Sequence, residues 1–193
     1  MKSKTIYIIS GCNGAGKTTA SYTILPEILN CKEFVNADNI AVGLSPFQPE
    51  KVAFEAGRIM LERIQYLLDN NLTFAIETTL ATKIYRSKLL KAIESGYNVK
   101  LLFFWLPNVE MAIKRVATRV KNGGHNIPKE VILRRYSRGI ENLFKNYIPL
   151  SNEWMVFDSS KSEIQMIAKG KNLKSIEVFQ NKKWEILKSY NNE

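Results

Sequence analysis

The stretch Thr5-Ile-Tyr-Ile-Ile-Ser10 passes directly into Gly11-Cys-Asn-Gly-Ala-Gly-Lys-Thr-Thr19. Its first six residues are apolar and β-rich, and they have the length of a strand. The glycines that follow permit backbone angles that turn N–H groups toward an anion, and a helix is expected to begin at Lys17. Strand, glycine loop and helix together predict a phosphate-binding site near the start of the chain.

The spacing of these residues identifies the ligand more closely. Gly11, four further residues and then Gly16-Lys17-Thr18 match the complete phosphate-binding-loop (P-loop) pattern. Lys17 supplies a point charge for the β- and γ-phosphates, and the Thr18 hydroxyl suits Mg²⁺. We therefore expect ATP or GTP together with Mg²⁺. The expected nucleotide-binding residues are Gly11, Asn13, Gly14, Ala15, Gly16, Lys17, Thr18 and Thr19.

Apolar strand-like segments alternate with helical segments along the rest of the chain. Further strands are expected at 33–36, 73–76, 99–106 and 154–157, with helical periodicity between them. This alternation predicts parallel βαβ units and a three-layer α/β sheet. We expect one P-loop domain over residues 1–168 and a C-terminal β-hairpin appendage over 169–193. The hairpin strands are expected at Ser175–Phe179 and Trp184–Leu187.

Acidic residues follow two of the expected strands, and ligands of open α/β sheets bind beyond such strand ends. Glu77 suits an acid that orients a metal-bound water or the substrate, so we expect it to bind Mg²⁺ with Thr18 and to contact substrate with Thr78. Asp38 is free to act as a general base toward an acceptor hydroxyl. Helix capping or an ordinary loop carboxylate is the alternative for both acids, and capping is the preferred interpretation for Asp158.

A second group of charged residues surrounds Gly123-Gly124. Two helices joined by this glycine hinge would form a mobile lid over residues 115–138 that closes over phosphates. Arg119 and Arg134 flank the hinge and are the expected catalytic arginines, although each is equally well explained as a solvated helix residue. His125 is expected to contact substrate, with a solvated loop histidine as the alternative.

Composition narrows the class of partner. Lys and Arg total 28 against 18 Asp and Glu, which gives a formal charge of +10 and suits an anionic ligand. The apolar runs are too short to span a bilayer and the N-terminus lacks a signal-peptide pattern, so we expect a cytoplasmic protein without a membrane partner. Cys12 and Cys31 have neither metal-ligand spacing nor a disulfide framework.

Four motifs carry a family resemblance: Gly-Cys-Asn-Gly-Ala-Gly-Lys-Thr-Thr at 11–19, Asn-Ala-Asp at 36–38, Ile-Glu-Thr-Thr at 76–79 and Gly-Gly-His-Asn-Ile-Pro at 123–128. With them the chain resembles the zeta toxin family, and in particular its small stand-alone members known as predicted ATPases. The resemblance implies a P-loop kinase fold, related to nucleotide kinases, with strand order 2-3-1-4-5. It also implies phosphorylation of the 3′-hydroxyl of UDP-N-acetylglucosamine, and an antitoxin protein that blocks the nucleotide site.

The resemblance also implies roles for single residues. The phosphate lysine of the family falls on Lys17, its base aspartate on Asp38 and its strand-end glutamate on Glu77. One of its two catalytic arginines falls on Arg115 or Arg119, and the other lands near His125. The lid therefore departs from the family pattern at the second arginine, which leaves the identity of the acceptor open.

Three functions remain after these observations, and the first is favoured. It is a kinase that transfers the γ-phosphate of ATP or GTP to a hydroxyl of a small molecule, such as a UDP-amino sugar. The second is a polynucleotide or nucleoside kinase, but aromatic residues are not interleaved with basic ones in the pattern of a nucleic-acid stacking surface. The third is a nucleotide-gated ATPase without kinase activity, which the absence of a Leu-Ser-Gly-Gly run and the Thr after Glu77 disfavour.

Overall fold

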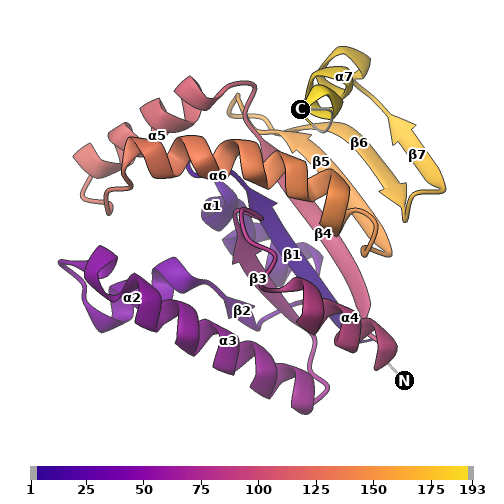
Figure 1. Cartoon of the computed structure of the whole chain (residues 1–193), viewed down its shortest axis with the longest axis horizontal. Coiled ribbons are helices and arrows are strands. Elements are labelled where there is room, and N and C mark those ends of the chain that lie inside the picture. The colour runs from indigo at the N-terminus through magenta and orange to yellow at the C-terminus, as the bar shows by residue number, and fades with distance from the viewer. Residues whose placement is uncertain (1–3, 191–193) are drawn as a thin grey trace.

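Strand β1 (Thr5–Gly11) lies at the centre of the sheet, and all seven of its residues are buried. Its apolar side chains face helices on both sides, which is why the run is continuous and not alternating. The parallel strands β3 (Phe74–Thr78) and β4 (Asn98–Trp105) pair with its two edges. The computed structural model describes residues 4–190, and Figure 1 shows the arrangement of its elements.

The complete sheet has the order β2-β3-β1-β4-β5-β6-β7. Strand β2 (Phe34–Val35) pairs parallel with β3, and β5 (Glu153–Asp158) pairs parallel with β4. The first five strands therefore confirm the expected parallel order 2-3-1-4-5. Strands β6 (Gln165–Lys171) and β7 (Ser175–Val178) extend the sheet in antiparallel pairing beyond β5.

Helices connect the strands and pack on both faces of the sheet, which gives three layers: helices, sheet and helices. Helices α2 and α3 lie on the β2 side of the molecule, whereas α5 and α6 lie next to each other on the β4 and β5 side (Figure 1). The helical elements are α1 (Lys17–Thr23), the π-helix η1 (Ile24–Ile28), α2 (Ala37–Leu44), the 3₁₀ helix η2 (Pro49–Val52), α3 (Ala53–Asp69), α4 (Arg86–Glu94), α5 (Val109–Lys121), α6 (Lys129–Asn142), the π-helix η3 (Leu143–Tyr147) and α7 (Asn181–Ser189).

The C-terminal hairpin differs from the sequence prediction. Its strands are β6 and β7, and the predicted second strand, Trp184–Leu187, lies inside helix α7. The reason is that Trp184 and Leu187 are one helical turn apart and both are buried, with the Trp184 ring stacked on Trp154 at a centroid distance of 5.6 Å. The hairpin turn is instead at Asn172, which adopts a left-handed φ of 50°. Residue 168 lies inside β6, so the hairpin continues the main sheet.

The parallel pairing places the carboxyl ends of the first five strands at one edge of the sheet. In register, Ser10 pairs with Thr78, Gly11 with Phe104, and Trp105 with Asp158. The loops that leave these ends therefore meet, and this edge holds the site described next. Within residues 4–190, the helices are all too short or too polar to cross a bilayer.

Candidate active site

The loop after β1 approaches the sheet so closely that only glycine fits at its first position. A Cβ atom on Gly11 would lie 2.1 Å from the Phe104 carbonyl oxygen, and Gly11 has a φ of 139°. Gly14 and Gly16 have left-handed φ values of 78° and 79°. Gly16 is the N-cap of α1, and no side chain of the described part of the chain caps this helix end. Backbone N–H groups in this conformation fit a phosphate group.

Lys17 holds its ammonium group inside this loop. The side chain is 7% exposed, its Nζ donates to the Cys12 carbonyl oxygen at 3.0 Å, and it lies 3.7 Å from Glu77 Oε1. Burial raises the pKa of the Cys12 thiol to about 11, so the thiol is protonated at neutral pH and does not act as a nucleophile. The functional group of this segment is therefore the lysine.

Thr18, Asn36 and Glu77 form a hydrogen-bonded group beside the lysine. The Thr18 hydroxyl donates to Glu77 Oε1 at 3.1 Å and Oε2 at 2.8 Å, and Asn36 Nδ2 donates to Oε2 at 2.8 Å. Burial raises the pKa of Glu77 above its ordinary value, although Lys17 opposes this shift. A hydroxyl and one carboxylate next to a phosphate loop are oxygen ligands of the kind that bind Mg²⁺ together with substrate phosphates. Thr18 and Glu77 therefore fit the expected metal.

Asn36 also sets the position of Asp38. Its Oδ1 atom accepts from the backbone N–H groups of Asp38 at 2.7 Å and Asn39 at 3.4 Å, which makes it the N-cap of α2. Asp38 thus lies in the first turn of a helix, where the helix dipole favours its negative charge. One side chain therefore fixes both acids, and this role of Asn36 was not predicted from the sequence. The Asn-Ala-Asp motif was the only available signal, because the bond to Glu77 spans 41 residues.

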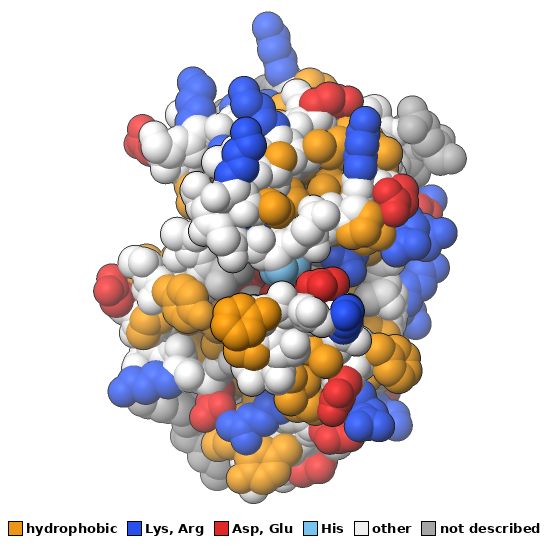
Figure 2. All heavy atoms as spheres, turned by 90° about the vertical axis from the view of Figure 1, so that its left-hand side faces the viewer, with side chains coloured by type: hydrophobic (Ala, Val, Ile, Leu, Met, Phe, Trp, Pro, Cys, Tyr) orange, Lys and Arg blue, Asp and Glu red, His pale blue; other side chains and the backbone are white. Residues whose placement is uncertain are grey.

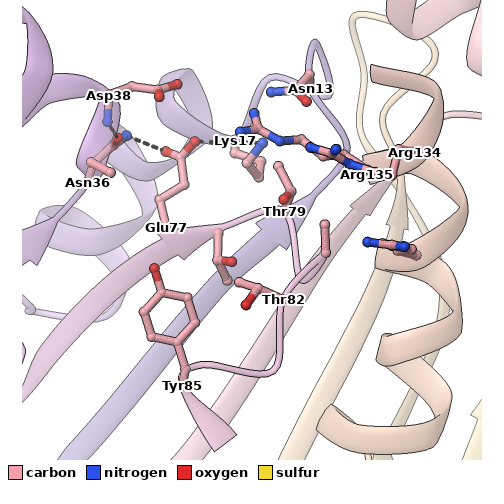
Figure 3. Close-up of a pocket in the computed structure, with 14 residues that line it drawn as sticks. Asn13, Lys17, Asn36, Asp38, Glu77, Thr79, Thr82, Tyr85, Arg134 and Arg135 are labelled. Carbon is pink, nitrogen blue, oxygen red and sulfur yellow. Dashed lines mark hydrogen bonds and ion pairs between the residues drawn. The ribbon is translucent and has the colours of Figure 1, made fainter. Parts of the chain in front are cut away.

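A central cavity of about 330 Å³ joins these groups. The structure brings six of the predicted site residues to this one cavity: Asn13, Lys17, Asp38, Glu77, Thr78 and Arg134. On the opposite wall are three arginines of α6, and Figure 3 shows Arg134 and Arg135 extending from that helix toward the P-loop. The cavity therefore combines an acidic wall, a lysine and a row of guanidinium groups.

The three arginines differ in burial. Arg134 and Arg138 are exposed, whereas Arg135 is half-buried, and burial lowers its pKa while Asp38 opposes this shift. An arginine stays charged despite such a shift. Of these three guanidinium groups, that of Arg135 is thus the one that the fold partly shields from water. Sequence spacing favoured Arg134, whereas Arg135 falls only within the predicted lid over residues 115–138.

A side cavity of about 260 Å³ adjoins the central one, and the two share Ala37, Asp38 and Arg135. It lies between α2 and the segment that joins α5 to α6. His125 and Glu50 line it with several apolar side chains. Figure 2 faces this side of the molecule, and the single histidine of the chain, in pale blue, is visible in a hollow.

His125 lies next to Asp38, and Arg119 in turn contacts His125. His125 Nε2 is 3.7 Å from Asp38 Oδ2, and the Arg119 guanidinium donates to the His125 carbonyl oxygen at 3.1 Å. Burial lowers the pKa of His125, and the neighbouring Asp38 acts in the opposite direction. Arg119 is not among the residues that line either cavity. Its contact with the site goes through His125.

Arg115 supports the loop from behind. Its guanidinium donates to the carbonyl oxygens of Gly14 at 3.4 Å and Ser160 at 2.8 Å. A Cβ atom on Gly14 would lie 3.0 Å from Arg115 Cβ, so α5 packs directly on the P-loop. Arg115 therefore joins the loop after β1 to the loop after β5.

Comparisons with known proteins identify relatives of this chain. The zeta toxin family model matches residues 48–192. An uncharacterised protein of Haemophilus influenzae is 28% identical over 136 residues, which cover 70% of this chain and 94% of that protein.

Several solved structures share the fold. One is the complex of AvrRxo1-ORF1 and AvrRxo1-ORF2 with ATP, at a TM-score of 0.74 and 18% identity, covering 97% of this chain and 64% of that one. The present chain thus spans less than two thirds of that relative. Another is the PezAT toxin-antitoxin system of Streptococcus pneumoniae, at a TM-score of 0.62 and 14% identity, covering 100% and 87%. At these identities the structures establish the fold, and the family model establishes the kinship: the chain belongs to the zeta toxin family and has its P-loop kinase fold.

Proposed function

We propose that the chain is an ATP-dependent kinase that transfers the γ-phosphate to a hydroxyl of a small molecule. The observation that carries this proposal is the Asn36 side chain, which bonds Glu77 on one side and the backbone of Asp38 on the other. It places two carboxylates at one cavity with the P-loop lysine, one beside the Thr18 hydroxyl and one away from it. Phosphoryl transfer requires one carboxylate that binds the metal ion and a second, separate carboxylate that acts as the general base.

The roles of the residues follow from their positions. The P-loop N–H groups and Lys17 hold the β- and γ-phosphates. Asp38 accepts the proton of the acceptor hydroxyl, the hydroxyl oxygen forms a bond to the γ-phosphorus, and the bond from that phosphorus to the bridging oxygen breaks to release ADP. Thr18 and Glu77 would hold Mg²⁺, which neutralises charge on the phosphates when it is bound. Arg134 and Arg135 stabilise charge on the transferred group from the opposite wall.

The acceptor that this cavity suits is anionic. Arg134, Arg135 and Arg138 line its wall, and the formal charge of the chain is +10. A nucleotide sugar carries a diphosphate for such a wall and free hydroxyls for Asp38. We therefore propose a UDP-amino sugar such as UDP-N-acetylglucosamine as the acceptor, in line with the family resemblance.

The test is radiolabelled ATP or GTP with a panel of UDP-sugars, nucleosides and short oligonucleotides. We expect label transfer to a UDP-sugar by the parent chain, no nucleotide binding by Lys17→Ala, and nearly intact ATP binding by Asp38→Asn. Turnover of Asp38→Asn should fall about 10²- to 10⁴-fold, the usual worth of a positioned base. Transfer to oligonucleotides alone would favour a polynucleotide kinase, and ATP hydrolysis without transfer would favour an ATPase. Parental transfer by Asp38→Asn would reduce Asp38 to a loop carboxylate.

We also propose an antitoxin protein as a partner and the cytoplasm as the site of action. The PezAT relative is described as a toxin-antitoxin system, and both cysteines of this chain are free and buried, as is common in a reducing compartment. Expression of the parent chain in a bacterial host should then slow growth, whereas Asp38→Asn should not. Equal growth with both chains would argue against a toxin.

A further inference from the structure

We propose that His125 is a positioning residue that holds the Asp38 carboxylate for proton abstraction, and that Arg119 acts through His125 and not on the substrate. The inference rests on the proposed kinase function for its effect on turnover. The contact itself stands on the geometry of three side chains from different elements: α2, the segment between α5 and α6, and α5.

The backbone of Asp38 is fixed by a hydrogen bond, but its carboxylate is exposed and must be oriented to act as a base. The backbone N–H bonds to Asn36 Oδ1 at 2.7 Å, whereas the side chain is 52% exposed. A general base must present one oxygen to the acceptor hydroxyl in a defined direction. His125 Nε2 lies 3.7 Å from Oδ2, which is within ion-pair distance but longer than a hydrogen bond, so the ring faces Oδ2 and leaves Oδ1 for the acceptor.

His125 is in turn held by Arg119. The Arg119 guanidinium donates to the His125 carbonyl oxygen at 3.1 Å and lies 3.4 Å from Nε2. Nε2 cannot accept from Arg119 and donate to Asp38 at the same time, because it either carries a proton or does not. An ionised Asp38 favours the state in which Nε2 carries the proton. The hydrogen bond from Arg119 to the His125 carbonyl oxygen then holds this residue in position while its ring faces Asp38.

The contact between His125 and Asp38 depends on where the connection between α5 and α6 lies. His125 belongs to the connection between α5 and α6, so an opening of that connection would remove the histidine from Asp38. The base is therefore oriented only while this connection lies against α2. Asp38 and Arg135 border both cavities, so the contact lies where the two cavities meet.

A direct test is the NMR titration of the imidazole, which is unambiguous because His125 is the single histidine of the chain. The charged groups that face it are Asp38 on α2, Glu50 on η2, Arg119 on α5 and Arg135 on α6. The pKa of His125 should fall in Asp38→Asn, because a carboxylate that favours the imidazolium is lost. It should rise in Arg119→Met, because a cation that disfavours the imidazolium is lost. A titration curve unchanged by Asp38→Asn overturns the contact whether or not the chain is a kinase.

Turnover provides the second readout. His125→Ala should lower kcat about tenfold to a hundredfold, less than the loss of the base itself, with the KM for ATP nearly unchanged. His125→Gln places an amide N–H near the position of Nε2 and should restore most of that loss. Lys121→Met removes an exposed charge from the end of the same helix as Arg119 and should match the parent. Parental kcat in His125→Ala, or no recovery in His125→Gln with a normally folded chain, would overturn the positioning role.

Discussion

The Thr18 hydroxyl donates to both carboxylate oxygens of Glu77, at 3.1 Å and 2.8 Å. This contact joins the first turn of α1 to the end of β3, across 59 residues of sequence. It also keeps a largely buried carboxylate close to the Lys17 ammonium, at 3.7 Å. Burial disfavours the charged form of Glu77, whereas metal binding requires that charge. The residue therefore lowers the stability of the fold while it supports activity.

Glu77→Gln should leave the free energy of unfolding at neutral pH equal to or above that of the parent, while turnover falls by orders of magnitude. Burial raises the folded-state pKa of Glu77 above 4.5, its ordinary value. Between 4.5 and the raised pKa the folded state binds more protons than the unfolded state, so parental stability falls as pH rises through that window. Thermal unfolding of both chains from acid to neutral pH measures the difference. A variant that is less stable than the parent at neutral pH would contradict this assignment.

Arg135→Ala should reduce turnover more than Arg134→Ala, with each variant retaining most of its ATP affinity. Arg135 is half-buried beside Asp38 and borders both cavities, whereas Arg134 is exposed. A fixed charge in a partly desolvated site is worth about 10²- to 10³-fold in rate when it acts on the transition state. Single-turnover rates with saturating ATP separate the two variants. Equal losses would mean that burial does not distinguish these guanidinium groups.

Lys183→Met should destabilise the fold by about 1–3 kcal/mol, the cost of leaving a buried charged acceptor without its partner. Lys183 of α7 pairs with Asp158 at the end of β5, and Asp158 Oδ1 accepts from the Ser160 N–H at 2.8 Å. The Ser160 carbonyl oxygen accepts from Arg115, which also contacts Gly14. The C-terminal helix is thus linked to the P-loop. Lys182→Met, an exposed neighbour on the same helix, is the matched control.

The loss in Lys183→Met should depend on pH. Burial of Asp158 opposes ionisation, but hydrogen bonds from Lys183 and Ser160 outweigh it and lower the pKa of Asp158 below 3.8. The contribution to stability is therefore present above 3.8 and is lost as pH falls through the lowered pKa. Denaturation of both chains at neutral and strongly acidic pH should give a difference only at neutral pH. A difference that persists in acid would point to packing of the lysine stem.

The parts of the site that sequence spacing predicted are local. The P-loop follows from glycines within nine residues, and Glu77 follows from its place after an apolar strand. Asn36 and Arg135 depend on contacts made in the folded chain. Consecutive helix residues point about 100° apart, so the choice between Arg134 and Arg135 depends on how α6 packs. For the same reason the sequence pattern predicted a strand at Trp184–Leu187, since the stacking partner Trp154 lies far away in sequence.

The hinge at Gly123 and Gly124 joins α5 and α6, which run antiparallel in Figure 1. The Gly123 and Gly124 N–H groups donate to the carbonyl oxygens of Val120 and Arg119 at 3.0 and 2.9 Å, and Gly123 has a left-handed φ of 85°. We expect ATP with Mg²⁺ to slow amide exchange across residues 115–138, because closure of this lid excludes water from the phosphates. Arg119→Ala and Arg134→Ala should each lower turnover more than they weaken ATP binding.

Two glycine variants distinguish a lid that closes when nucleotide binds from a hairpin that stays fixed. Gly123→Ala meets open space but adds about 1–2 kcal/mol of backbone strain, whereas a Cβ on Gly124 would lie 2.6 Å from Arg119 Cγ and displace that side chain from His125. Gly124→Ala should therefore reduce turnover as Arg119→Ala does, and Gly123→Ala should mainly change the nucleotide-dependent protection of the lid. Identical exchange with and without nucleotide, together with parental turnover in both arginine variants, would mean that residues 115–138 form a fixed surface hairpin. The positive charge for phosphoryl transfer would then have to come from Lys17 and from the other two arginines of the cavity wall, Arg135 and Arg138.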